Sequence, residues 1–233
     1  MKQFKRTISV VLALLMILGA FTALPVSAAQ IDESENQSTG SSSDEGVVFI
    51  TSEAELRGFA SRVNNGDSMK NKTVYVAQGK SNEFTYYRQE CNIEINRMVG
   101  SSSAPFSGRY DGDGYTLTFN TTTSDATGCA PFKVASTAVI QHVRTAGSIV
   151  ANHKFASGLV AFGYNTLEIT DCYSGIAIES NVEDDATHGG FVAVTGDDSN
   201  VKIEGCVFGG ELLGPASGGC GGIVGYYGKQ VII

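Results

Sequence analysis

Acidic residues carry the clearest catalytic potential in this sequence. Asp184 and Asp185 lie in "VEDDATHGG" with His188 close behind, and Asp197 and Asp198 follow in "TGDDSN". Paired carboxylates could act as general acid and general base on a glycosidic bond. The competing interpretation is that acids in inserted loops form a solvated rim. No basic or nucleophilic partner stands beside them, so we favour the rim and assign no catalytic residue.

Metal chemistry finds little support in the spacing of the polar residues. His142, His153 and His188 lie in different segments, and no pair has metal-ligand spacing on a single strand. Asp111 and Asp113 in "DGDG" have the spacing of part of a calcium loop, but its other oxygen ligands are not correctly placed. A tight Asp-Gly turn between two strands is the favoured alternative. We therefore expect no metal and no cofactor.

Tyrosines are the best candidates for a binding surface. Tyr164, Tyr173, Tyr226 and Tyr227 could offer flat faces to a sugar or to a protein. The acidic pair Asp184 and Asp185 completes this set of candidate ligand-binding residues. The alternative is that the tyrosines partly cover an edge of the fold. The partners expected from this set are a carbohydrate or a surface protein of a host or neighbouring cell.

The beginning of the chain predicts export. Residues 1–28 combine a positive start, an apolar run and small residues before Ala28, as a secretory signal peptide does, with a retained anchor as the alternative. No other segment could cross a membrane. Residues 29–46 are acidic and serine-rich and predict a flexible linker. We expect a secreted or cell-surface protein. The net charge of −8 excludes nucleic acid as a partner, because phosphates would be repelled.

A capped helix and several strands are predicted from residue 47 onward. Ser52 and Glu55 have the spacing of a capping box. The helix face that follows is apolar, with Leu56, Phe59, Ala60 and Val63 at helical spacing. Short strands are expected at 47–50, 72–76 and 92–96, and the "DGDG" turn is expected to join two strands as a hairpin. The segment 47–137 should form a cap and the first coils.

The segment 138–233 repeats itself. Ile140, Ile169 and Ile203 occupy equivalent positions 29 and 34 residues apart, and each begins an alternating strand. A second register places Gly158, Gly190 and Gly222 at intervals of 32 residues. Repeats of about thirty residues made only of short strands are typical of a solenoid, in which each coil buries its apolar face against the next.

The repeat alignment also predicts which side chains share a row. The inward rows should be the three isoleucines, the row Val143–Cys172–Cys206 and the row Leu159–Phe191–Ile223, while Ala146, Gly175 and Gly209 should lie at corners and residues 181–188 should form an inserted loop. The five cysteines match neither a zinc pattern nor a dense disulfide framework. For Cys172 and Cys206 we favour a reduced packing ladder, with a disulfide as the alternative.

Three motifs carry a resemblance to a known group of proteins. "SEAELRGFASRVNNGDSMKNKTVYV", "PFSGRYDGDGYTLTF" and "GGIVG" resemble the lead-in, the hairpin and the GLUG-type repeat of secreted bacterial right-handed β-helix surface proteins. The resemblance covers residues 47–233. It implies an all-β, right-handed parallel β-helix, a pectate-lyase-like fold, here without catalytic residues.

The function predicted from these features is a secreted or cell-surface β-helix module of a larger bacterial protein. It would serve as an adhesin, a stalk or a recognition surface without catalysis of its own. The alternative is the N-terminal part of a polysaccharide lyase or glycoside hydrolase whose catalytic coils lie downstream. "VII" at 231–233 follows "VKI" at 201–203 by one repeat, which predicts the first residues of a further coil and hence a truncated, aggregation-prone fragment.

Overall fold

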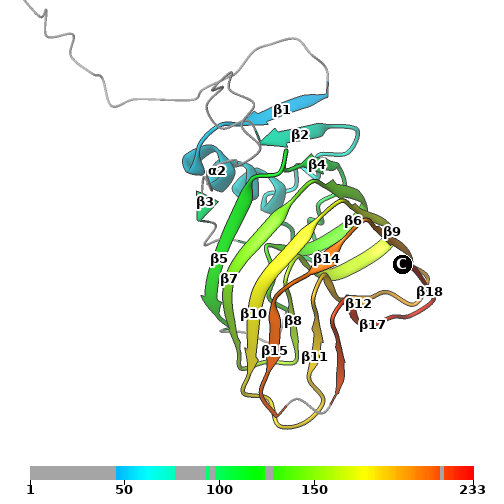
Figure 1. The fold of residues 1–233 in the computed structure, drawn as a ribbon. Helices are drawn as coiled ribbons and strands as arrows, with labels where there is room; N and C mark the ends of the chain where they lie inside the picture. The colour runs from blue at the N-terminus through cyan, green and yellow to red at the C-terminus, as the bar shows by residue number, and fades with distance from the viewer. Residues whose placement is uncertain (1–45, 77–92, 95–97, 124–127, 216–217) are drawn as a thin grey trace, which may run out of the picture. The chain divides into compact units, whose positions relative to one another are not determined.

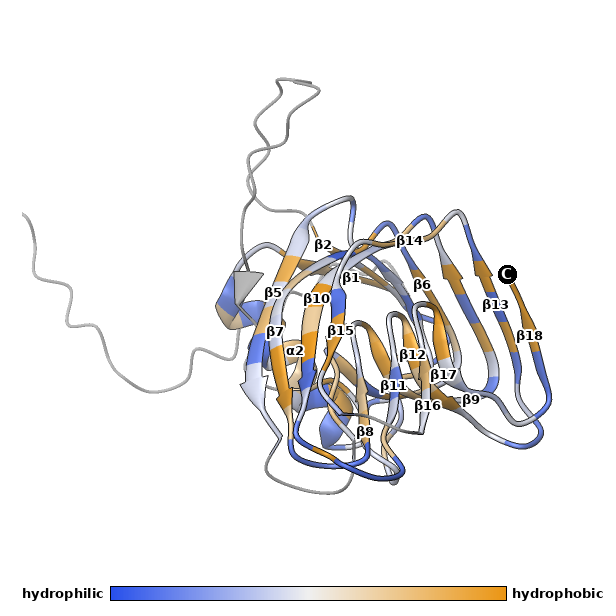
Figure 2. Ribbon diagram, turned by 60° about the horizontal axis from the view of Figure 1, so that its bottom comes forward, coloured by the Kyte–Doolittle hydropathy of each residue, from blue (hydrophilic) through white to orange (hydrophobic). Residues whose placement is uncertain are grey.

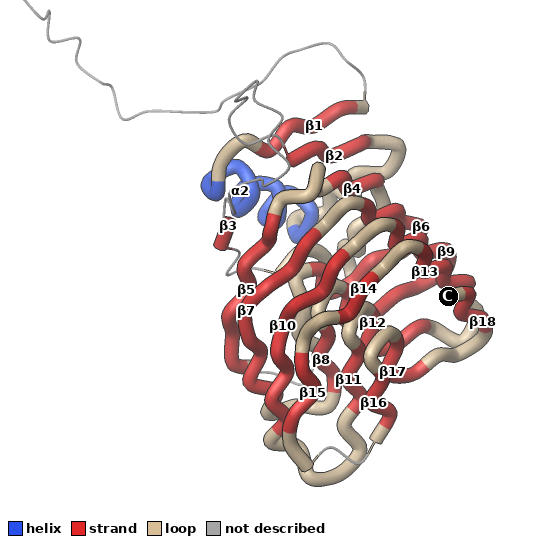
Figure 3. Tube along the Cα trace, viewed as in Figure 1, coloured by secondary structure: helices blue, strands red, loops and turns tan. Residues whose placement is uncertain are grey.

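The computed structural model describes residues 46–76, 93–94, 98–123, 128–215 and 218–233. The predicted signal peptide and nearly all of the predicted linker lie outside these residues. The strands of the described part stack as a parallel β-solenoid, and a single helix stands at one end of the coils (Figures 1 and 3). The architecture expected from the thirty-residue repeats is thereby confirmed.

Helix α2 (Glu53–Asn64) forms where the capping box predicts it. The Ser52 hydroxyl accepts a hydrogen bond from the Glu55 backbone N–H at 3.3 Å. The Glu55 carboxylate reaches back one residue further than expected, to the Thr51 N–H at 2.6 Å. These bonds satisfy backbone donors that the first turn of a helix leaves free. The apolar face packs inward, because Leu56, Phe59, Ala60 and Val63 are all buried.

The described strands form three parallel sheets. Sheet A contains β1 (Val47–Ile50), β2 (Thr73–Val76), β4 (Arg109–Asp111), β6 (Phe132–Gln141), β9 (Val160–Thr170), β12 (Val192–Thr195), β13 (Asn200–Glu204), β17 (Val224–Tyr226) and β18 (Gln230–Ile232). Sheet B contains β3 (Ile93–Glu94), β5 (Thr116–Thr122), β7 (Arg144–Ala151), β10 (Tyr173–Ser180), β14 (Val207–Phe208) and β15 (Glu211–Leu213). Sheet C contains β8 (Phe155–Ser157), β11 (Thr187–Gly189) and β16 (Gly219–Gly221).

Each complete coil passes through all three sheets in the same order. The chain runs from sheet C into the first half of a sheet A strand, continues through its second half and turns into sheet B. In one coil β9 spans both halves of sheet A, whereas in the next coil the same path is divided between β12 and β13, both of which pair with β9. The inserted loop of this next coil is shorter than predicted, because β11 already begins at Thr187.

The core consists of rows of equivalent side chains from successive coils. Ile140, Ile169 and Ile203 are paired in register and buried, as the repeat alignment predicts. In the second predicted row Leu159 and Phe191 are buried, while Ile223 is half-buried. Figure 2 shows the same effect as hydrophobic bands that recur from strand to strand. Val231 pairs with Val201, which confirms that "VII" occupies the strand position one repeat after "VKI".

Two local expectations need correction. The "DGDG" segment is a turn, but the strands beside it do not pair with each other: β4 pairs with β2 and β6, and β5 pairs with β3 and β7. The turn therefore joins sheet A to sheet B. Ala146 and Gly175 do not lie at a corner, because they pair inside β7 and β10. The chain turns three or four residues earlier, as the site described next shows.

Candidate functional site: a polar cleft at one corner of the solenoid

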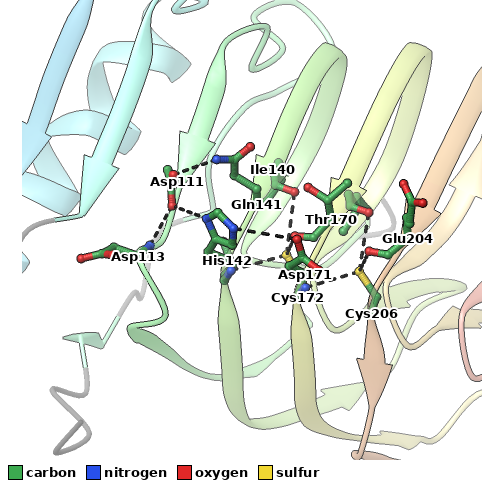
Figure 4. A network of polar contacts seen from close by, with 12 residues as sticks. Asp111, Asp113, Ile140, Gln141, His142, Thr170, Asp171, Cys172, Glu204 and Cys206 are labelled. Atoms are coloured by element: carbon green, nitrogen blue, oxygen red, sulfur yellow. Dashed lines mark hydrogen bonds and ion pairs between the residues drawn. The ribbon is translucent and has the colours of Figure 1, made fainter. Parts of the chain in front are cut away.

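The corner between sheets A and B is made by one residue per coil in the left-handed conformation. His142 (φ 52°), Asp171 (φ 52°) and Gly205 (φ 64°) follow strands β6, β9 and β13 directly; we call these three residues the corner row. Glycine adopts this conformation freely, and Asp and His tolerate it better than most residues. The corner row therefore places an imidazole and a carboxylate side by side on successive coils (Figure 4).

Asp111 anchors the polar network at this corner. Its Oδ1 accepts a hydrogen bond from the Asp113 backbone N–H and lies 3.0 Å from Nδ1 of His142. Its Oδ2 accepts a 2.7 Å hydrogen bond from the side-chain amide nitrogen of Gln141. The side-chain oxygen Oε1 of Gln141 in turn accepts a hydrogen bond from the guanidinium of Arg109. Partial burial raises the pKa of Asp111, but the hydrogen bonds from Asp113, Gln141 and His142 outweigh it. The pKa of Asp111 consequently lies below its usual value, and the side chain is a firmly held carboxylate.

His142 stands between two carboxylates. Nε2 of its ring lies 3.9 Å from Oδ2 of Asp171, on the side away from Asp111. That distance is longer than a hydrogen bond. The Asp171 side chain is 67 % exposed, so it keeps acceptor positions open to the solvent. Asp111 fixes the ring, and Asp171 remains available to a ligand.

His142 and Asp171 border a cleft of about 640 Å³ that Arg144 and Tyr173 also line. The guanidinium carbon of Arg144 lies 4.7 Å from the centre of the Tyr173 ring, a cation–π contact. Within the described residues Arg144 has neither an ion pair nor a hydrogen-bond acceptor for its side chain. The cleft thus contains both a guanidinium held over a tyrosine ring and an exposed carboxylate.

Two cysteines, Cys172 and Cys206, directly follow the corner residues Asp171 and Gly205 in the chain. Cys172 Sγ donates to the Thr170 carbonyl at 3.2 Å and accepts the Val143 N–H at 3.4 Å. Cys206 Sγ repeats this arrangement one coil later, donating to the Glu204 carbonyl at 3.3 Å and accepting the Cys172 N–H at 3.4 Å. Both cysteines are free, and the predicted row Val143–Cys172–Cys206 is confirmed. Beyond packing, the sulfurs satisfy backbone groups at the bend.

The four candidate tyrosines do not form one surface. Tyr173 borders the cleft, but its ring is covered by Arg144 on one side and lies against Gly209, where an added Cβ would stand 2.4 Å from the hydroxyl. Tyr164 is on β9, with its ring parallel to that of Phe162 at 6.4 Å. Tyr226 and Tyr227 are exposed at the end of β17 and just beyond it. Tyr173 is therefore the one candidate tyrosine in the cleft.

The candidate acids lie away from this cleft. Asp184 and Asp185 are in the turn before β11, where Asp185 forms a 2.6 Å ion pair with Lys154. Asp197 and Asp198 occupy the turn between β12 and β13 and are exposed. All four are solvated turn residues, the arrangement that the rim interpretation expects.

His188 differs from its expected place. We predicted it in the inserted loop, but it lies in β11 and is buried. Burial lowers the pKa of His188, opposed by a hydrogen bond to the His153 backbone. All three residues of β11 are buried, and His188 pairs with Ala156 of β8 on one side and with Cys220 of β16 on the other, so neighbouring coils cover it.

Sequence reasoning predicted Tyr173 as a binding residue but did not assign His142, Arg144 or Asp171 to a site, although a signal was available. His142 and Asp171 directly precede Val143 and Cys172, which the repeat alignment already placed side by side. Extending that alignment by one residue on each side would have brought together His142 with Asp171, and Arg144 with Tyr173. The corner row was overlooked because the corners were expected four residues later, at Ala146, Gly175 and Gly209.

In the part of the chain that the structure describes, no hydroxyl or thiol contacts His142 as a nucleophile would, and no group of three or more His, Cys, Asp or Glu side chains could hold a metal ion. The described residues also contain no helix that is long and apolar enough to cross a membrane. No family model matches the chain, and neither a curated protein nor a solved structure shows significant similarity to it.

Proposed function

We propose that this chain is a secreted or cell-surface β-solenoid module that recognises a carbohydrate at the corner cleft and performs no catalysis of its own. The resemblance of its repeats to GLUG-type surface proteins supports the extracellular setting. The observation that carries the proposal is the pairing of Arg144, fixed over Tyr173 with its N–H groups free, with the exposed carboxylate of Asp171.

Sugars suit this pairing because each hydroxyl group both donates and accepts hydrogen bonds. A guanidinium supplies donors in a rigid planar fork, and a carboxylate supplies acceptors only. Because both residues line the same cleft, the hydroxyls of a bound saccharide would find donors at Arg144 and acceptors at Asp171. Hydrogen bonds to charged groups contribute about 1.5–3 kcal/mol each, so a few of them account for the modest affinity that a surface module needs.

The proposal is tested by binding to a panel of neutral and uronic-acid polysaccharides, with Arg144→Ala and Asp171→Asn as the cleft variants. Matched controls are Arg57→Ala on α2 and Asp184→Asn in the turn before β11, both exposed and outside the cleft. We expect each cleft variant to weaken binding roughly tenfold or more, and the controls to leave it unchanged.

Three results would contradict the proposal. The first is the absence of binding to every polysaccharide, and the second is equal loss in cleft and control variants. The third is cleavage of a bound polymer that depends on Asp111, His142 or Asp171. That last outcome would favour the alternative, part of a carbohydrate-active enzyme, for which the imidazole between two carboxylates is the one supporting feature.

A further inference from the structure

Cys172 and Cys206 occupy the same position on successive coils. Tyr173 pairs with Val207 in the parallel register of β10 and β14, so the residues just before them are neighbours. Neighbouring parallel strands lie about 4.8 Å apart, within the range of roughly 4.4–6.8 Å between Cα atoms that a disulfide requires. The backbone spacing therefore already suits a covalent bond between the two coils.

The Cys206 side chain also reaches the coil that carries Cys172. Cys206 Sγ accepts the N–H of Cys172 at 3.4 Å, just as Cys172 Sγ accepts the N–H of Val143 one coil earlier. Val143 carries no thiol, so along this row of the described residues Cys172 and Cys206 are the two cysteines that are neighbours.

The two thiols differ in reactivity. The neighbouring Cys172 thiol lowers the pKa of Cys206 to about 7, against the opposing effect of burial. Cys206 is half-buried and so can be reached from the solvent. The neighbouring Cys206 thiol and burial raise the pKa of Cys172, which is only 3 % exposed. Cys206 is thus the thiol suited to attack an external disulfide, whereas Cys172 is the neighbouring thiol that can react once Cys206 carries the mixed disulfide.

We propose that Cys172 and Cys206 are a cross-linking site, which a small-molecule disulfide converts into a bond between two coils. The Cys206 thiolate attacks one sulfur of the oxidant, forms a mixed disulfide and expels the first small thiol. Cys172 then loses its proton to water, attacks the Cys206 sulfur and expels the second. Two protein thiols are oxidised, and one external disulfide is reduced to two thiols. This inference does not depend on the proposed carbohydrate binding.

The cross-link would fasten two short strands at an edge of sheet B. Val207 in β14 is 58 % exposed and Leu213 in β15 is 49 % exposed, although both strands pair with β10. A disulfide between 172 and 206 closes the chain segment that contains the whole intervening coil. By restricting the unfolded segment, it should suppress local opening of β14 and β15.

The test treats the full chain with oxidised glutathione at neutral pH, quenches with acid, alkylates the free thiols under denaturing conditions and maps the peptides. We expect a peptide pair joined through Cys172 and Cys206, with two hydrogen atoms lost. Cys206→Ser should abolish the joined pair, whereas Cys220→Ser, which removes an exposed thiol on β16, should leave it intact. Oxidation should also slow amide exchange in residues 207–213 roughly tenfold or more.

Every other product overturns the proposal. Two free thiols after treatment, a mixed disulfide that stays on Cys206, or a bond from either cysteine to Cys220 or to a second molecule would each show that the pair does not close. Because the decisive measurement is made on the unaltered chain, it does not depend on whether a serine variant folds.

Discussion

The two ends of the described solenoid are covered to different extents. At the first coils α2 packs on buried aromatic residues. The centre of the Phe59 ring lies 5.9 Å from the ring centres of both Phe106 and Tyr110. In the last coil Ile223 and Val224 are only half-buried, although their equivalents Phe191 and Val192 one coil earlier are fully buried. Burial in this fold is therefore decided by the neighbouring coil, not by the residue itself.

The largest effect should come from removing the centre of the covered end. Phe59 joins the helix to an aromatic cluster in which the ring centres of Tyr110 and Phe132 lie 5.1 Å apart. Phe59→Ala should lower the free energy of unfolding by about 3–5 kcal/mol, through lost transfer energy and the cavity left behind. Chemical denaturation measures it. A loss below about 1 kcal/mol would mean that the helix does not stabilise the first coils.

A second test compares one substitution at two positions. Ile169→Ala removes a side chain buried between Ile140 and Ile203, and should cost about 2–5 kcal/mol. Ile223→Ala, in the half-buried last coil, should cost clearly less, because little neighbouring structure surrounds it. Equal losses in denaturation experiments would contradict the dependence on neighbouring coils.

The polar corner supplies a third, pH-dependent test. The pKa of Asp111 is lowered in the folded state, so its stabilisation is present at neutral pH and is lost as the pH falls through that lowered value, below the usual 3.8. Asp111→Asn should cost about 1–2 kcal/mol at neutral pH. The gap between wild type and variant should close in acid. A gap of constant size between about pH 7 and pH 2 would show that the carboxylate charge is not what stabilises the corner.

The smallest effect should come from the helix cap. Ser52→Ala removes the hydroxyl that accepts the Glu55 N–H, and should cost about 1 kcal/mol. The exposed neighbour Glu53→Gln is a control that keeps the cap. Thermal unfolding followed by circular dichroism measures both. If the Ser52 variant is as stable as the control, the cap does not contribute to the covered end.

Much of this fold could be predicted because its information is local and repeated. Alternation within strands and the recurrence of Ile140, Ile169 and Ile203 predicted the solenoid, and the helix periodicity around Phe59 predicted α2. The corner could not be predicted in the same way, since two of its three residues are His and Asp in a conformation that favours glycine. Of the cleft only Tyr173 was predicted, because the other residues meet it through the lateral register of the coils, to which the repeat alignment was not extended. Likewise, the burial of His188 depends on its neighbours β8 and β16.

Hydrogen exchange of the reduced protein tests most directly the claim that each coil is protected by the next. Residues 160–169 and 224–232 occupy equivalent strands of sheet A, one enclosed between coils and the other in the last coil. The account predicts slow exchange in residues 160–169 and at least about tenfold faster exchange in residues 224–232. Equal protection of the two segments in the monomeric protein would contradict it.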